Sequence, residues 1–145
     1  MSNIKSILAS GGNRILAVTP DDNILETLKK MSEYSVGALL VLEHDNLVGI
    51  VSERDYARKV ILEGKNSTDT KVKEIMTPNP ITVGANDSLK TCMETMTNNH
   101  IRHLPVVDQG KILGVLSNRD LLKAVISQQE FLIDQLESYI QTGQM

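Results

Sequence analysis

The chain of 145 residues carries 18 acidic and 15 basic side chains, and its formal net charge of −3 together with only four aromatic residues argues against nucleic acid as a partner. A chain of this length can bury about 70% of the surface that its unfolded form exposes, and its single cysteine excludes an internal disulfide framework. Because no 18 apolar residues run together and the N-terminus lacks an uninterrupted apolar segment, we expect a cytoplasmic protein with no membrane partner.

An internal repeat organises the sequence. A shift of 65 residues aligns residues 18–61 with 83–126 without a gap, and 11 of these 44 pairs are identical. Upstream, residues 4–8 match residues 72–76 if the first copy carries three extra residues, which we place in a turn at Gly11-Gly12-Asn13. Self-similarity at a fixed offset indicates two copies of one structural unit.

The same elements are predicted in the same order in each copy. A short apolar strand (Ile15 to Val18, and Ile81 to Val83) precedes a helix whose apolar residues recur at i, i+4 and i+7. These residues are Ile24, Leu28 and Met31 in the first copy and Leu89, Met93 and Met96 in the second. Two apolar runs then predict an antiparallel hairpin, closed by EHDN in one copy and by DQGK in the other. A second helix begins at Glu53 and at Asn118, which completes a β-α-β-β-α unit.

The pattern predicts a mixed α/β (α+β) fold. The two repeats occupy residues 4–62 and 72–126, and the polar segment 63–71 links them. Residues 127–145 continue the helical spacing of apolar residues past the end of the second repeat. This extended C-terminal helix either lies on its own domain or contributes to a dimer contact, and the sequence leaves both interpretations open.

A motif of the form G-x-x-S-x-R-D ends each hairpin. Its members are Gly49, Ser52, Arg54 and Asp55, and then Gly114, Ser117, Arg119 and Asp120. A serine followed three residues later by an acid at a helix start is typical of a capping box, and capping alone would explain a single occurrence. The second occurrence, with glycine and arginine retained, favours an additional role.

The residue types of the motif suit a nucleotide. A helix N-terminus with an arginine in its first turn can hold a phosphate. The carboxylate offers two acceptor oxygens, which match the two hydroxyls of a ribose. The glycine leaves the strand bare where a ligand or another backbone segment comes close.

On this motif, and on the segments ALLVLEHDNLVGIVSERD, RHLPVVDQGKILGVLSNRD and IMTPNPITV, the chain resembles the cystathionine-β-synthase (CBS) domain in its tandem form, the Bateman module. The resemblance covers about residues 4 to 126. It implies two repeats related by pseudo-two-fold symmetry, which bind an adenine nucleotide in clefts between them and regulate without catalysing a reaction. AMP is the first ligand that we expect, followed by ADP, ATP, NAD(H) and S-adenosylmethionine, with no metal. It also implies a homodimer, for which the apolar second helices are suited, and an unknown target protein.

The resemblance assigns two clefts, each completed by the opposite copy. The first comprises Ser52, Arg54 and Asp55 together with Ile81, Thr82, Val83, Ile101, Arg102 and His103. Asp55 would hold ribose, Thr82 would lie near the base, and Arg54, Arg102 and His103 would lie near phosphate. The second comprises Ser117, Arg119 and Asp120 together with Leu16, Ala17, Val18, Val36, Gly37 and Ala38. Because Ala17 replaces the threonine and Gly37-Ala38 the basic pair, we expect weaker binding there, or a larger or less charged ligand.

Two other functions stay open from the sequence. One is an interaction scaffold whose clefts have lost their ligand. The other is a nucleotide-processing enzyme, against which the lack of an apparent Ser-His-Asp set or metal cluster argues. His100 and His103 have no evident third metal ligand, and Cys92, at helical spacing with Met96, is predicted to be a buried structural thiol.

Overall fold

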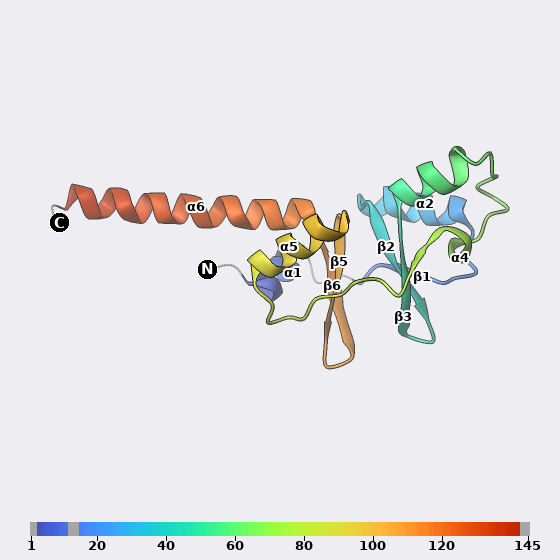
Figure 1. Cartoon of the computed structure of the whole chain (residues 1–145), viewed down its shortest axis with the longest axis horizontal. Helices are drawn as coiled ribbons and strands as arrows, with labels where there is room; N and C mark the ends of the chain where they lie inside the picture. The colour runs from blue at the N-terminus through green and yellow to red at the C-terminus, as the bar shows by residue number, and fades with distance from the viewer. Residues whose placement is uncertain (1–2, 12–14, 143–145) are drawn as a thin grey trace.

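The structure, a computed structural model, describes residues 3–11 and 15–142, so residues 12–13 of the predicted turn and the last three residues of the chain lie outside the described part. In chain order the elements are α1 (Ile4–Ser10), β1 (Ala17–Val18), α2 (Ile24–Tyr34), β2 (Ala38–Glu43), β3 (Asn46–Ser52), α3 (Glu53–Tyr56), the π-helical turn η1 (Ala57–Ile61), α4 (Val72–Ile75), β4 (Thr77–Pro78), α5 (Leu89–Asn99), β5 (His103–Asp108), β6 (Lys111–Ser117) and α6 (Asn118–Gln141). The mixed fold of two repeats with a long C-terminal helix is confirmed (Figure 1).

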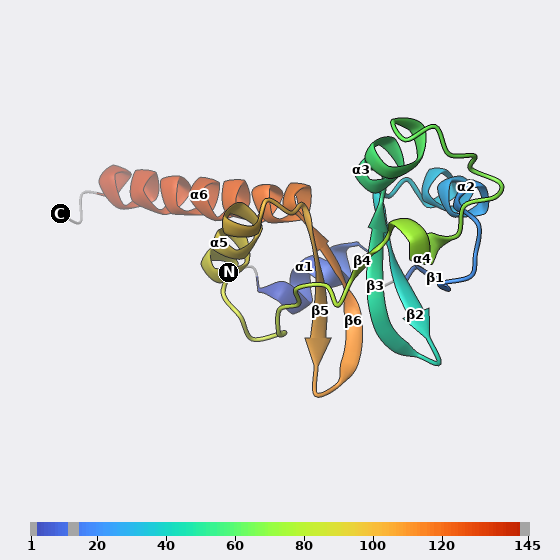
Figure 2. The same cartoon turned by 45° about the vertical axis from the view of Figure 1, so that its right-hand side comes forward.

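Both hairpins have the same register and the same irregularity. β2 pairs antiparallel with β3, and β5 with β6, and a bulge follows Val41 and, 65 residues later, Val106. The turns between the strands place two consecutive residues at positive φ, His44-Asp45 and Gln109-Gly110. Two-residue loops of this kind match the right-handed twist of the strands that they join. The two hairpins lie side by side at the centre of the molecule (Figures 1 and 2).

The first strand of each copy is shorter than predicted. β1 comprises only Ala17 and Val18, and in the second copy only Val83 pairs, through an isolated parallel bridge to Val106. In the first copy, Leu40 N–H donates to Leu16 O over 3.2 Å. The residue equivalent to Leu40 is Pro105, which has no N–H, so the second copy cannot form this hydrogen bond and its strand contracts to a bridge.

The buried face of the helix α5 is shifted by about one residue from the predicted one. Met93 was expected in its buried stripe, but its side chain is exposed, whereas Cys92 is fully buried. The equivalent position in α2, Thr27, is buried as well. Because neighbouring residues of a helix point about 100° apart, the core receives Cys92 in place of Met93. The predicted burial of the Cys92 thiol is thus confirmed, and burial raises its pKa.

The two lead-in segments are exchanged between the hydrophobic cores. Ile4 and Leu8 of α1, which precede the first copy, are buried in the core of the second copy with Leu104 and Leu116. Val72 and Ile75 of α4, which precede the second copy, are buried in the core of the first copy, next to Leu39 and Val51. Figures 1 and 2 show α1 beside β6 and α4 beside β3. Each core is therefore completed by a helix from the other half of the sequence.

Gly49 of the repeated motif allows another backbone segment to approach. β4 pairs with β3 at Gly49 and Ile50, and a Cβ atom on Gly49 would lie 2.5 Å from Met76 Sδ and 3.0 Å from Thr77 O. Of the two roles considered for this glycine, the structure thus shows the close approach of a second strand.

We expect Gly49→Ala to lower the free energy of unfolding by about 1–3 kcal/mol, because overpacking forces displacement of the neighbouring backbone. The Met76 side chain can move, but Thr77 O belongs to β4. Urea denaturation followed by circular dichroism measures the change. Gly37→Ala is the matched control, since its Cβ would make only ordinary contacts at 3.7 Å with His103. Equal stability of both variants would contradict the close approach.

Candidate functional site

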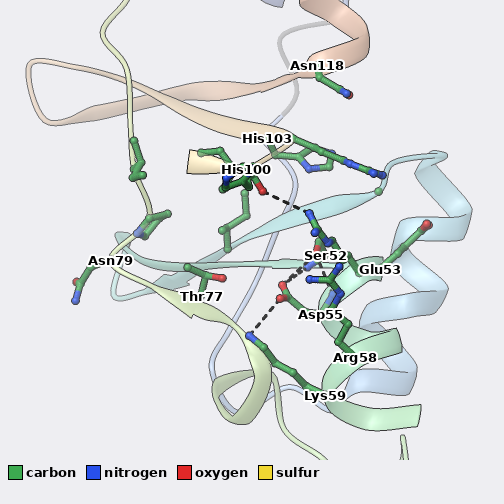
Figure 3. A pocket seen from close by; sticks show the side chains of 17 residues that line it. Ser52, Glu53, Asp55, Arg58, Lys59, Thr77, Asn79, His100, His103 and Asn118 are labelled. Atoms are coloured by element: carbon green, nitrogen blue, oxygen red, sulfur yellow. Dashed lines mark hydrogen bonds and ion pairs between the residues drawn. The ribbon is translucent and has the colours of Figure 1, made fainter. Parts of the chain in front are cut away.

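A cavity of 810 Å³ opens between the two copies, at the ends of the hairpins where the second helix of the first copy begins. Its lining residues are Gly37, Ile50, Ser52, Glu53, Arg54, Asp55, Arg58, Lys59, Thr77, Asn79, Pro80, Ile81, His100, Ile101, Arg102, His103 and Asn118. Figure 3 shows Glu53, Asp55, Arg58 and Lys59 of α3 and η1 on one side of the cavity, and Thr77, Asn79, His100 and His103 from the segments around β4 and β5 on the other. Its size lies within the usual range of small-molecule sites, about 300–1,000 Å³.

Asp55 is held in a fixed orientation at the edge of this cavity. Its Oδ2 accepts hydrogen bonds from Ser52 N–H at 2.9 Å and from Ser52 Oγ at 3.1 Å, and Asp55 N–H donates to Ser52 Oγ at 3.2 Å. This is the predicted capping box, and it uses one carboxylate oxygen. The other, Oδ1, lies 3.2 Å from Lys59 Nζ (Figure 3). Asp55 therefore presents an oriented acceptor oxygen whose present partner is a side chain that can move.

The cavity lining carries more positive than negative charge. Its basic side chains are Arg54, Arg58, Lys59 and Arg102, and its acidic side chains are Glu53 and Asp55. Lys59 Nζ also donates to Ile75 O at 2.9 Å, and Arg54 Nη1 donates to His100 O of the second copy at 3.4 Å. Four cations against two anions make the cavity suitable for an anionic ligand.

His103 lies between the two halves of the molecule and faces charges from both copies. Burial lowers the pKa of His103, and Arg102 acts in the same direction, whereas Asp120 and Asp55 oppose the shift. The imidazole is thus neutral at neutral pH. The positive charge available to an anion in this cavity comes from the arginines and Lys59.

A second, smaller cavity of 260 Å³ lies at the equivalent position of the other copy. It is lined by Ile7, Leu8, Gly11, Leu16, Tyr34, Ser35, Val36, Ala38, Leu113, Gly114, Val115 and Asp120. Asp120 repeats the capping geometry, with Ser117 N–H donating to Oδ2 at 2.9 Å. The residue equivalent to Lys59 is Ala124, which is buried, so Asp120 has no equivalent lysine. The lining of the second cavity contains one acidic side chain, Asp120, and no lysine or arginine.

The predicted residues of the first cleft converge with two exceptions. Ser52, Arg54, Asp55, Ile81, Ile101, Arg102 and His103 line the large cavity. Thr82 is exposed and does not belong to the lining, and Val83 is buried in the core of the second copy. Val83 forms a parallel bridge to Val106 of β5, which holds it in the core of the second copy.

The predicted residues of the second cleft are more dispersed. The small cavity is lined by four of them, Leu16, Val36, Ala38 and Asp120, but Val18 is buried in the first core and Gly37 lines the large cavity. Ala17, Ser117 and Arg119 are not among the lining residues. Arg119 is exposed, so the cation expected to hold a phosphate in the second cleft does not face the small cavity.

The sequence interpretation missed several polar residues of the large cavity. They are Arg58, Lys59, Thr77, Asn79 and His100. One signal for Lys59 was present, since it lies four residues after Asp55, a spacing that brings two side chains together on a helix. The residues Thr77 and Asn79 are brought to the cavity by β4, whose pairing with β3 follows from no local pattern.

Neither a metal cluster nor a membrane span is found among residues 3–11 and 15–142. These residues contain no group of three or more His, Cys, Asp or Glu side chains that could hold a metal ion. None of their helices has the length and apolar character needed to cross a bilayer.

The comparisons with known proteins agree with the repeat and the fold. The CBS domain profile matches residues 12–62 and 72–127, and the chain therefore belongs to the CBS domain family, as a tandem pair. The CBS domain-containing protein CBSX3 of Arabidopsis thaliana, described as mitochondrial, is 38% identical over 145 residues, covering 97% of this chain and 70% of the relative.

Solved structures share the fold. A CBS-domain protein from Burkholderia ambifaria is 44% identical with a TM-score of 0.84, covering 88% of this chain and 96% of its own. The CBS domain pair of protein MJ0100, solved with 5-methylthioadenosine and S-adenosyl-L-methionine, has a TM-score of 0.77 at 23% identity, covering 88% of this chain and 98% of its own. At that identity the likeness shows the arrangement of the two repeats.

Proposed function

We propose that this chain is a regulatory module that binds an adenine nucleotide, with AMP as its first candidate ligand, in the large cavity between the two repeats. The observation that carries the proposal is the combination, in one cavity, of the oriented carboxylate of Asp55 and four basic side chains. Support comes also from the MJ0100 domain pair, which was solved with two adenosine compounds.

Each part of a nucleotide has a matching group in the lining. The Oδ1 oxygen of Asp55, which is paired with Lys59 in this structure, accepts hydrogen bonds from the ribose hydroxyls when Lys59 turns away from it. Lys59, Arg54 and Arg102 then meet the phosphates, with Arg58 beside them. Ile81 and Ile101 supply apolar surface for the flat base. The small cavity around Asp120, whose lining contains no lysine or arginine, suits a nucleoside that carries little charge.

Regulation, in this proposal, follows from the position of the cavity between the copies. Arg54 already joins the first copy to His100 of the second. A ligand that contacts both copies favours the arrangement in which both sets of contacts form, and it shifts the population by its difference in affinity. A change of about 1–3 kcal/mol is typical of such coupling. A separate target protein would read this change.

Calorimetric titration tests the proposal. Protein freed of carried-over ligand is titrated with adenosine, AMP, ADP, ATP, NAD, NADH and S-adenosylmethionine. We expect AMP to bind at least tenfold more tightly than adenosine, because a charge-assisted hydrogen bond contributes about 1.5–3 kcal/mol. Binding of adenosine as tight as that of AMP would contradict a phosphate role for the basic side chains. No binding across the panel would leave the interaction scaffold as the better hypothesis.

An enzymatic role would show itself in the same samples. Incubation with ATP or NAD at high protein concentration, followed by chromatography, is expected to return the nucleotide unchanged. Turnover that Asp55→Ala removes would overturn the regulatory assignment.

A further inference from the structure

The helix α6 continues far beyond the second repeat. It comprises 24 residues, which corresponds to about 36 Å, and Figure 1 shows its C-terminal half running away from the rest of the molecule. Every described residue from Gln129 to Thr142 is exposed. The exposed apolar side chains of α6 are Leu122, Ile126, Phe131, Leu132, Ile133, Leu136, Tyr139 and Ile140.

Five of these side chains lie along one face of the helix, in a stripe that Gln129 interrupts and that we call the α6 stripe. It comprises Leu122, Ile126, Ile133, Leu136 and Ile140. Successive members lie four, seven, three and four residues apart, and the step of seven is divided by Gln129 into three and four. With Gln129 included, the positions follow the alternating steps of three and four residues that define a coiled-coil seam. Leu122 and Ile126 are about half exposed although they lie beside the second repeat, which itself covers Leu121 and Ala124 on another face of the helix.

The resemblance to the family implied a homodimer whose contact would be formed by the apolar second helices of both copies. The structure limits that contact, because Val60 and Leu121 are buried in the two cores and are not available to a partner. Ile61, Leu122 and Ile126 remain exposed. On α6 a larger exposed apolar surface is available, the α6 stripe. A dimer contact through this helix was one of the two interpretations that the sequence left open.

The charges along one edge of the stripe indicate which partner fits it. Lys123, Glu130 and Glu137 recur every seven residues and therefore share one side of the helix. In a parallel pair of α6 helices this side would face Val125, Leu132 and Tyr139, which offer no charge. In an antiparallel pair the same side of each helix meets its own counterpart, so that Lys123 faces Glu137 of the second copy at both ends and Glu130 faces Glu130 at the centre. Two pairs of opposite charge against one pair of like charge favour this orientation over the parallel one, which offers no opposite charge.

The apolar residues agree with the same reversal. When two α6 helices run in opposite directions about a centre near residue 131, Ile126 faces Leu136 of the second copy and Leu122 faces Ile140. Ile133 then lies opposite Gln129, so the two central layers are apolar on one helix only. Each projecting helix end then covers the exposed apolar residues beside the partner's second repeat. We propose that the α6 stripe is a dimer interface in which α6 pairs antiparallel with α6 of a second copy of this chain.

Sedimentation equilibrium of the full chain at micromolar concentration is the first test. The mass of the wild-type protein is expected to be twice that of Ile133→Asp, which places a charge inside the stripe. Phe131→Asp is the matched control. Phe131 is equally exposed, and the residues three and four positions away are all polar, so it lies outside the stripe. An unchanged mass in Ile133→Asp, or a wild-type mass of 16 kDa, would overturn the proposal.

Exchange of the charges tests the antiparallel orientation. Lys123→Glu and Glu137→Lys should each raise the dissociation constant of the dimer about tenfold, since each puts like charges at both ends. The double variant should restore the wild-type dissociation constant within about twofold. Like charges facing each other at an interface lower affinity, and exchanging both residues again places opposite charges at both ends. Failure of the double variant to recover would show that these two residues do not meet across the dimer. All four proteins should keep the same helix content by circular dichroism, which excludes misfolding as the cause.

Discussion

Asp55→Ala is expected to weaken AMP binding by about tenfold to a hundredfold. The carboxylate is only 16% exposed, and the capping box with Ser52 and the ion pair with Lys59 hold it in place. Its loss would leave the ribose hydroxyls without their acceptor, which costs about 1.5–3 kcal/mol for a hydrogen bond to a charged group. Calorimetric titration of variant and wild type measures the difference.

The internal repeat supplies the control for this variant. Asp55→Ala also removes a helix cap, which lowers stability by about 0.5–2 kcal/mol. Asp120→Ala removes the equivalent cap, whose hydrogen bond from the serine N–H has the same length of 2.9 Å. It leaves the large cavity intact, so its affinity for AMP should stay within about twofold of wild type. Equal losses in both variants would assign the effect to helix capping and would contradict a ribose contact.

Ile75→Ala is expected to lower the free energy of unfolding by about 2–5 kcal/mol, the range for truncating a fully buried isoleucine. Ile75 is 1% exposed and is buried in the core of the first copy, although the sequence places it before the second copy. Its loss leaves a cavity next to Val51 and Val72 that the hairpin cannot fill. Urea denaturation followed by circular dichroism measures the change.

Leu62→Ala is the control for Ile75→Ala. Leu62 is 77% exposed, so its truncation should change stability by less than about 0.5 kcal/mol. A loss below about 1 kcal/mol in Ile75→Ala would mean that the α4 helix does not contribute to the first core. Ile4 of α1 is buried in the second core although it precedes the first copy, and Ile4→Ala should lower the free energy of unfolding to a similar extent.

Local patterns were sufficient to predict the repeated part of the fold. The hairpins, their turns and the capping boxes of Ser52 and Ser117 depend on residues close together in sequence, and all were confirmed. The predicted length of the first strands was wrong because parallel pairing depends on a distant residue, and Pro105 removes the donor on which the second copy would rely. Helical spacing also misjudged α5, since an apolar periodicity fixes the facing direction only to within about one residue.

The cavity was predictable to a lesser degree than the fold. Ser52, Arg54 and Asp55 could be found because they repeat in sequence, and the segment from Ile101 to His103 because the family resemblance supplied it. Thr77 and Asn79 reach the cavity only through the pairing of β4 with β3, a contact between segments more than twenty residues apart. The small cavity is lined in part by Leu8 and Leu113, which come from opposite ends of the sequence and are brought together by packing that no motif reports.

The exchange of α1 and α4 imposes an order on folding during synthesis. When residue 62 leaves the ribosome, the first repeat still lacks Val72 and Ile75, so it exposes an incomplete core. The helix α1 is made first, yet its apolar side chains find no partner until β6 is complete. The first core can therefore close as soon as α4 has been made, whereas the second core, which joins Ile4 and Leu8 to Leu116 and Leu121, closes only after β6 and the start of α6 have been made.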